Sequence, residues 1–180
     1  MTTAGINVEL TGQRAVVHGD CPTECCRYGD WTIGPTAVRD RPDSSAPAIA
    51  SVSRELAVHA DSGLVVVDQV GLAVATKNVD VEGLEQMPSD SGLGRRHLAV
   101  PSGDTLMLLR EGEGGYMFLW RGKVGADLEP TESGDNGVQW LRRPSERQWW
   151  AYITSKASSL RGWINVDRNE VSGADACGRI

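Results

Sequence analysis

Three of the four cysteines lie within six positions of the chain, in the segment HGDCPTECCRYGDW (18–31). They are Cys21, Cys25 and Cys26, and the fourth, Cys177, follows about 150 residues later. Thiols gathered in this way can bind a metal, take part in redox exchange or form structural disulfides. Their spacing and the residues around them favour one of these three kinds of chemistry over the others.

Structural disulfides are the preferred interpretation. An even number of cysteines in a small, loop-rich chain favours two disulfides in an oxidising compartment. Cys25 and Cys26 are neighbours and should not pair with each other, because the small ring would strain the peptide bond between them. One of them is therefore expected to pair with Cys21 and the other with Cys177, and the sequence leaves open which. The bridge to Cys177 would close a loop of roughly 150 residues, worth about 5 kcal/mol by the loop-entropy relation.

Zinc binding is the alternative for this cluster, with His18 as a ligand beside the thiols of Cys21, Cys25 and Cys26. The spacing His-x2-Cys-x3-Cys-Cys differs from the usual structural zinc patterns, in which paired ligands are two to four residues apart. Thiol redox chemistry is disfavoured because the sequence has no Cys-x-x-Cys motif. We therefore expect neither a metal nor another cofactor.

Catalytic groups are not recognisable elsewhere in the sequence. The three histidines, His18, His59 and His97, are each isolated from residues that could activate them. A Cys25–His97 pair of the cell-wall peptidase kind would need flanking residues typical of a nucleophile site, and these are missing. The glycine-rich segment REGEGG (110–115) lacks the Gly-Lys-Ser/Thr that completes a phosphate-binding loop, and is expected to be a hairpin turn. We therefore predict no catalytic residue and no enzymatic activity.

Composition narrows the class of partner. The chain has 180 residues and a net charge of −6, which disfavours nucleic acid and anionic membrane surfaces as partners. No apolar run approaches the roughly 20 residues of a membrane-spanning helix. The start MTTAGINVEL has neither the basic nor the apolar region of a signal peptide, so the chain is expected to be cytosolic or the mature form of an exported protein.

Short apolar segments separated by turns predict an all-β protein. The chain has 21 glycines and 8 prolines, which interrupt these segments at short intervals. We expect an N-terminal lead-in with the cysteine loop (1–28), a first barrel-like unit (29–78), an acidic linker (79–94) and a second unit (95–180). Within the first unit, the segment ADSG (60–63) is expected to form a hairpin turn between two apolar strands.

The second unit resembles the Src-homology-3-type barrel in its bacterial form. The resemblance lies in SGDTLMLL (102–109), QWWAYI (148–153) and LRGWINVD (160–167), which are similar to the Gly-Asp-x-Leu, Trp-Trp and Gly-Trp-Ile strands of that family. The first unit is at best a degenerate copy. This resemblance implies two small Src-homology-3-like barrels in tandem, stapled by disulfides.

A narrower resemblance covers nearly everything from Cys21 onward. The motifs ECCRYGDW (24–31) and DACG (175–178) are similar to those of a group of uncharacterised exported bacterial proteins. This resemblance implies a periplasmic or secreted location and supplies no reaction, because fold alone does not give function.

Aromatic residues on the expected strands form the candidate binding site. They are Tyr116, Trp120, Trp149, Tyr152 and Trp163. Alternation along a strand places Trp149 and Trp150 on opposite faces. In barrels of the resembled type the first Trp of the pair faces the ligand groove, so we expect Trp149 to be exposed and Trp150 to be buried. Grooves of this kind bind extended peptides in polyproline form; alternatively, the outward aromatics pack on the other β unit.

The function favoured by these observations is non-catalytic binding in the bacterial envelope. The expected partner is a peptide, cell-wall material or another protein. A second possibility is a structural or assembly subunit, whose β edges and aromatic residues build an interface between copies. A third is a zinc-binding protein or a degenerate hydrolase accessory protein.

Overall fold

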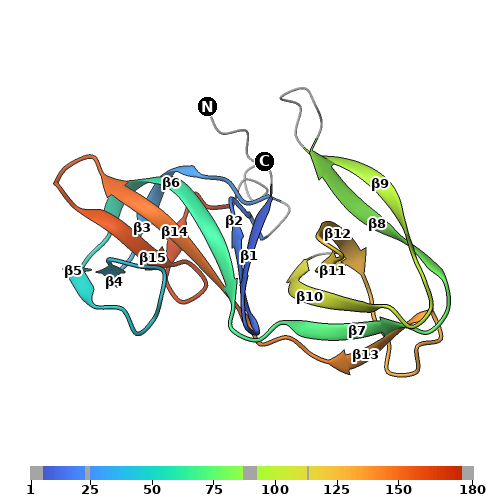
Figure 1. Cartoon of the computed structure of the whole chain (residues 1–180). Coiled ribbons are helices and arrows are strands. Elements are labelled where there is room, and N and C mark those ends of the chain that lie inside the picture. Colours follow the sequence, from blue (N-terminus) through green and yellow to red (C-terminus); the bar gives the residue numbers. More distant parts are fainter. Residues whose placement is uncertain (1–5, 23–24, 87–92, 113, 176–180) are drawn as a thin grey trace. The chain divides into compact units, whose positions relative to one another are not determined.

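The computed structural model describes residues 6–22, 25–86, 93–112 and 114–175 (Figure 1). These residues form sixteen strands in two antiparallel sheets and contain no helix, which confirms the prediction of an all-β protein. Consequently, no helix in the described part of the chain is long and apolar enough to cross a membrane.

The chain forms two compact units, and each is built from two separate stretches of sequence. Unit 1 comprises Met1–Val16 and Val67–Arg147, and unit 2 comprises Val17–Val66 and Gln148–Ile180. The division of the fold therefore differs from the expected consecutive units 29–78 and 95–180. Local patterns locate strands but do not show which distant strands pair, and the pairing decides the division.

Unit 1 contains eight complete strands. They are β1 (Asn7–Thr11), β7 (Gly71–Ala75), β8 (Val79–Gln86), β9 (Leu93–Val100), β10 (Thr105–Gly112), β11 (Gly115–Trp120), β12 (Lys123–Leu128) and β13 (Val138–Arg142). Its sheet has the order β13-β7-β10-β11-β12-β8-β9. The segment REGEGG lies where β10 and β11 join as a hairpin, with Gly112 opposite Gly115, as predicted.

Unit 2 contains the remaining strands. They are β3 (Gly29–Ile33), β4 (Thr36–Arg39), β5 (Ala48–Val52), β14 (Arg147–Ser155), β15 (Arg161–Asn165) and β16 (Val171–Ser172), with most of β6 (Leu56–Val67) and the end of β2 (Arg14–His18). These strands belong to a nine-stranded sheet with the order β1-β2-β6-β14-β15-β4-β5, in which β3 also pairs with β6 and β16 pairs with β3. The Trp-Trp strand β14 and the Gly-Trp-Ile strand β15 lie side by side, as the sequence predicted.

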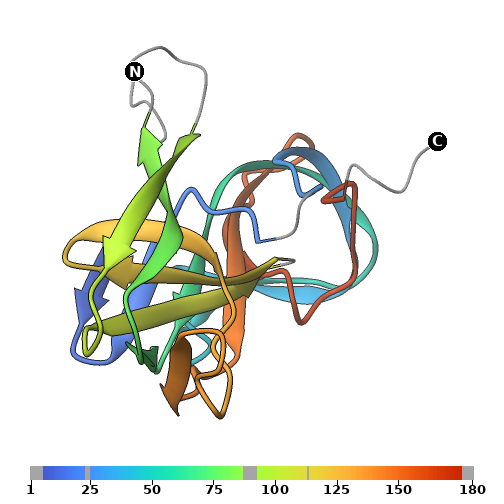
Figure 2. The same cartoon turned by 90° about the vertical axis from the view of Figure 1, so that its right-hand side faces the viewer.

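Two turn and linker predictions are wrong. The acidic stretch expected as a linker forms β8, which pairs with β9 from Val79 opposite Val100 to Gln86 opposite Leu93, and the two strands form a long twisted hairpin (Figure 2). Its apolar residues alternate with acidic ones, and this period of two outweighs the acidic composition. The segment ADSG (60–63) lies inside the twelve-residue strand β6 and makes no turn.

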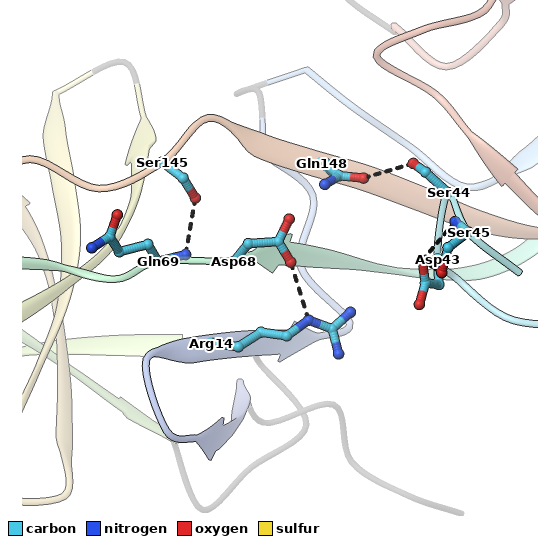
Figure 3. Close-up of polar contacts among 8 residues, drawn as sticks. All are labelled: Arg14, Asp43, Ser44, Ser45, Asp68, Gln69, Ser145 and Gln148. Atoms are coloured by element: carbon cyan, nitrogen blue, oxygen red, sulfur yellow. Dashed lines mark hydrogen bonds and ion pairs between the residues drawn. The ribbon is translucent and has the colours of Figure 1, made fainter.

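Polar contacts fasten unit 1 near the positions where the chain enters and leaves it (Figure 3). Arg14 Nε lies 3.3 Å from Asp68 Oδ1, and the backbone N–H of Gln69 donates to Ser145 Oγ at 3.0 Å. The backbone N–H of Val70 donates to the carbonyl of Gln13 at 2.8 Å. These contacts join the N-terminal stretch of unit 1 to the start of its longer stretch, and that start to the end of the same stretch.

The core of unit 1 contains two large side chains, Phe118 and Leu98, that each pack on a glycine. Phe118 is fully buried, and Gly125 lies opposite it on β12. Gly125 in turn lies opposite Gly83 on β8. A methyl group at position 125 would overlap the Phe118 ring, and one at position 83 would lie 2.6 Å from Leu98 Cγ. The sheet therefore needs glycine at both positions so that Phe118 and Leu98 can pack on it.

We predict that Gly125→Ala destabilises unit 1 by about 1–3 kcal/mol, the usual cost of forcing extra volume into a packed core. Gly103→Ala is the control, because that position has a positive φ of 89° but open space around it, so it tests backbone conformation alone. The measurement is urea denaturation of both variants beside the parent. An equal loss of unfolding free energy in the two variants would show that the contact with Phe118 is not the reason for glycine at position 125.

Candidate functional site

The cysteine loop is closed by a disulfide. Cys21 is bonded to Cys26, with Cα atoms 5.6 Å apart, and Cys25 is also disulfide-bonded; Cys177 lies outside the described residues. The prediction that Cys21 pairs with one of the two adjacent cysteines is confirmed, and the partner is Cys26. The disulfide favours the structural interpretation over the zinc alternative, because sulfurs joined to each other are not thiolate ligands. For the same reason the bonded Cys25 cannot be a nucleophile beside His97.

The segment before Cys177 runs beside this loop. Cys26 and Asp175 form an antiparallel bridge, and the backbone N–H of Arg27 donates to the carbonyl of Ala174 at 2.9 Å. The Arg27 guanidinium donates to the carbonyl of Gly173 at 3.3 Å. This pairing brings a residue two positions before Cys177 next to the loop, which supports the expected bridge between the loop and that cysteine.

A buried aromatic cluster begins directly after the cysteine loop and joins β3 to β14. Tyr28 and Trp31 stack with ring centroids 5.9 Å apart, and Trp149 meets the Trp31 ring edge-on, also at 5.9 Å. Trp149 is only 6% exposed, so the prediction that it faces an open groove is wrong. Trp150 is 1% exposed, which agrees with its predicted burial.

The hydroxyl group of Tyr28 is the polar centre of this cluster. It donates to the carbonyl of Asp20 at 2.6 Å and accepts from Trp149 Nε1 at 3.2 Å. Burial raises the pKa of Tyr28 to about 12. The hydroxyl lies directly over Gly63 of β6, where a methyl group would overlap it and would also lie 2.8 Å from the carbonyl oxygen of Trp150. Glycine at position 63 thus allows Tyr28 to reach its partners.

Two of the predicted aromatic residues form a pair on the opposite face of β14 and β15. Tyr152 lies opposite Trp163 in the register, and their rings meet edge-to-face at 5.4 Å and 70°. Both side chains are half-buried. Trp150 and Asn165 are paired next to them on the same face, and Trp150 Nε1 and Asn165 Nδ2 are buried without a hydrogen-bond partner in the described structure. Asn165 Oδ1 accepts from the backbone N–H of Arg168, which fixes the amide orientation.

The two remaining predicted residues belong to unit 1. Trp120 is 6% exposed and belongs to the core, where its Nε1 donates to Asp104 Oδ2 at 2.9 Å; its expected place on a binding surface is therefore wrong. Tyr116 is half-buried and meets Trp140 edge-to-face at 5.2 Å, and partial burial raises its pKa. Trp140 was not among the predicted residues; the Arg143 guanidinium lies over its indole ring at 4.5 Å.

One histidine has a carboxylate partner that the sequence did not reveal. His59 Nδ1 lies 2.9 Å from Asp30 Oδ1, and Lys156 Nζ lies 2.8 Å from the same oxygen. The His59 contact, followed by that of Lys156, lowers the pKa of Asp30 to about 2. Asp30 and His59 lie opposite each other on β3 and β6, so strand register brings them together. Asp30 is largely exposed and His59 is half-buried, and ion pairs open to solvent in this way contribute little to stability.

Comparison with protein-family models, curated proteins and solved structures finds no match. The function must therefore be argued from the surfaces of the two units.

We predict that native protein formed under oxidising conditions has no reactive thiol. Peptide mapping without reduction should recover a Cys21–Cys26 linkage and a second linkage between Cys25 and Cys177. The intact mass should fall below the reduced mass by the hydrogens of two bridges. Four reactive thiols together with stoichiometric zinc would contradict this arrangement.

We predict that Tyr28→Phe lowers the free energy of unfolding by about 1–3 kcal/mol, because it leaves the carbonyl of Asp20 and the indole N–H of Trp149 unpaired. Tyr152→Phe is the control, since that tyrosine is half-buried on the other face of the sheet. The stabilities would be measured by urea denaturation near pH 8.

The same pair of proteins tests the titration of Tyr28. The phenol ionises near pH 10 in the unfolded chain and near pH 12 in the native protein, so the native state holds its proton longer. Its stabilising contribution is complete below pH 10 and is lost as the pH rises from 10 to 12. The difference in unfolding free energy between the parent and Tyr28→Phe should therefore decrease as the pH rises through this interval. An advantage that stays constant would show that Tyr28 is not protonated preferentially in the native state.

Proposed function

We propose that the protein is a non-catalytic binding module of the bacterial envelope, and that it binds through the outer face of β14 and β15. We call this face the Tyr152–Trp163 surface. Its members are the half-buried Tyr152, Thr154 and Trp163 and the exposed Arg161; Trp150 and Asn165 lie on the same face of the strands but are buried. The observation that supports it best is the half-buried Tyr152–Trp163 pair.

The chemistry of this surface suits a ligand that carries carbonyl or carboxylate oxygens. The polar groups of its half-buried and exposed members are an indole N–H, a guanidinium and two hydroxyls, and neither strand places a carboxylate on this face. Arg161, opposite Thr154, is exposed. Because Trp150 and Asn165 are buried, the groups that a ligand can reach on this face are those of Tyr152, Thr154, Arg161 and Trp163. Extended peptides and cell-wall material supply such oxygen acceptors, and a partner protein can do the same.

Two further features support the envelope location and the family resemblance. A disulfide in a small β protein is typical of an oxidising compartment. The pairing of β14 with β15 is the arrangement expected of the Trp-Trp and Gly-Trp-Ile strands of a Src-homology-3-like barrel, the fold class with which peptide-binding aromatic grooves are associated. The third motif of the resemblance, SGDTLMLL (102–109), lies in unit 1. The proposed surface also differs from the expected groove because Trp149 and Trp120 are buried and Tyr116 belongs to unit 1.

We predict that Tyr152→Ala and Trp163→Ala each weaken binding at least about tenfold, which corresponds to ~1.4 kcal/mol. Two probes would be used: co-sedimentation with purified peptidoglycan sacculi, and tryptophan fluorescence with a proline-rich peptide. Trp140→Ala is the matched control, because it removes one ring of the other edge-to-face pair. Thermal melting identifies any variant that has unfolded, and Trp163→Phe, which keeps a ring, replaces Trp163→Ala in that case.

Retained binding in both surface variants would contradict the proposal, as would an equal loss in Trp140→Ala. A parent protein that binds neither sacculi nor the peptide would also contradict it.

A further inference from the structure

Exposed large hydrophobic side chains occur at sheet edges in this protein. Among the described residues they are Leu10 on β1, Ile49 on β5 and Leu141 on β13, with exposed fractions of 39%, 54% and 57%. β1 and β5 end the strand path of the nine-stranded sheet, and β13 ends that of the seven-stranded sheet. An edge strand also presents unpaired backbone N–H and C=O groups, so these positions combine two kinds of unsatisfied surface.

β5 differs from the other strands that end a sheet path because it carries no charge. Its sequence is AIASV, whereas β1 contains Glu9, β13 contains Arg142 and β9 contains Arg95. Charged side chains on an edge discourage another strand from pairing with it. β5 lies beside β4 at the end of the sheet of unit 2 (Figure 1). Among the strands that end a sheet path, it is the one without a charged side chain that would discourage pairing with another strand.

The apolar interior of unit 2 reaches this edge. Val38 is fully buried, and it lies opposite Ala50 of β5. A methyl group on Gly162 would lie 2.8 Å from Val38 Cγ1 and 3.1 Å from Ile49 Cδ1, so both side chains extend over that glycine. Ile49 nevertheless remains 54% exposed. The Ile49 side chain therefore extends the apolar core past β5, the last strand of the sheet. A further strand paired with β5 would cover this side chain.

We propose that β5 pairs with β5 of a second copy of the chain, in an antiparallel arrangement with two-fold symmetry. Pairing centred on Ala50 places Ile49 opposite Ser51 of the second copy and Ala48 opposite Val52. The two Ile49 side chains then lie diagonally on the same face, close enough for long side chains to touch. Each Ile49 covers the other, and no charge is buried. A symmetric pairing of this kind closes after two copies.

Exposed charges of both signs flank β5 at each end. The turn before β5 contains Arg41 and Asp43, and the Asp43 carboxylate accepts from the backbone N–H and the hydroxyl of Ser45, both at 2.8 Å (Figure 3). The segment after β5 contains Arg54 and Glu55. An antiparallel partner brings these two segments together, so neither end meets a run of like charge. The strand is bounded by Pro47, which has no N–H to extend the ladder.

The interface is small, which sets the expected affinity. β5 has five residues, so the buried area lies below the roughly 1,200 Å² of a standard stable interface. The dimer should therefore be weak and dependent on concentration. This inference is separate from the Tyr152–Trp163 surface, because it concerns another copy of the chain and not a ligand.

Sedimentation velocity of the full, oxidised chain from about 10 µM to about 1 mM, a range that brackets weak association, tests the proposal. The parent should approach the dimer mass as concentration rises, while Ile49→Lys and Ser51→Lys should remain monomeric. Leu141→Lys is the matched control, because it places the same charge on an equally exposed edge leucine, and it should dimerise like the parent. Circular dichroism and thermal melting of each variant establish that it is folded.

A parent that is monomeric throughout this range would overturn the inference, as would dimers in Ile49→Lys or their loss in Leu141→Lys. Binding of Ile49→Lys to sacculi or peptide distinguishes the two proposals. If the variant loses dimerisation and retains binding, β5 and the Tyr152–Trp163 surface are independent.

Discussion

The hydroxyl group of Tyr28 connects parts of unit 2 that are far apart in the sequence. It bonds to the carbonyl of Asp20 in the cysteine loop and to the indole of Trp149 on β14, and it lies directly over Gly63 of β6. These contacts require burial of a polar group, which is tolerated only because both hydrogen bonds are made. The disulfide between Cys21 and Cys26 restrains the loop from which Asp20 and Tyr28 approach, so it acts on the same site.

The strands could be predicted from the sequence because they depend on local information. Short apolar segments on either side of a turn marked β14 and β15, and their pairing follows from the short connection between them. The division into units could not be predicted, because it depends on β15 pairing with β4 and on β16 pairing with β3. The acidic composition of residues 79–94 suggested a linker, yet Val79 and Val81 pack against the core of unit 1 and make β8 a strand. Local sequence patterns do not show which strands pair when they are far apart in the chain.

The candidate site shows the same limit at the level of side chains. Alternation correctly separated Trp149 from Trp150, but it could not tell which face would be covered. Trp31, placed in a different unit by the sequence analysis, covers Trp149 and removes it from the surface. The contact between His59 and Asp30 was hidden for the same reason, since strand pairing brings together residues 29 positions apart. Tyr152 and Trp163 were found correctly as neighbours because their strands are joined by a short turn.

The two proposed surfaces follow from an uneven distribution of side-chain volume in unit 2. Large rings fill the interior where β3 faces β14, and there Tyr28, Trp31 and Trp149 leave little apolar surface exposed. Toward β5 the side chains become small, and Gly162 separates β14 from the valine and isoleucine that end the core. Small residues allow β4 and β5 to pack closely, but they cannot extend far enough to cover Ile49. A second strand of the same composition can, because it contributes the missing side chains and the missing hydrogen bonds together.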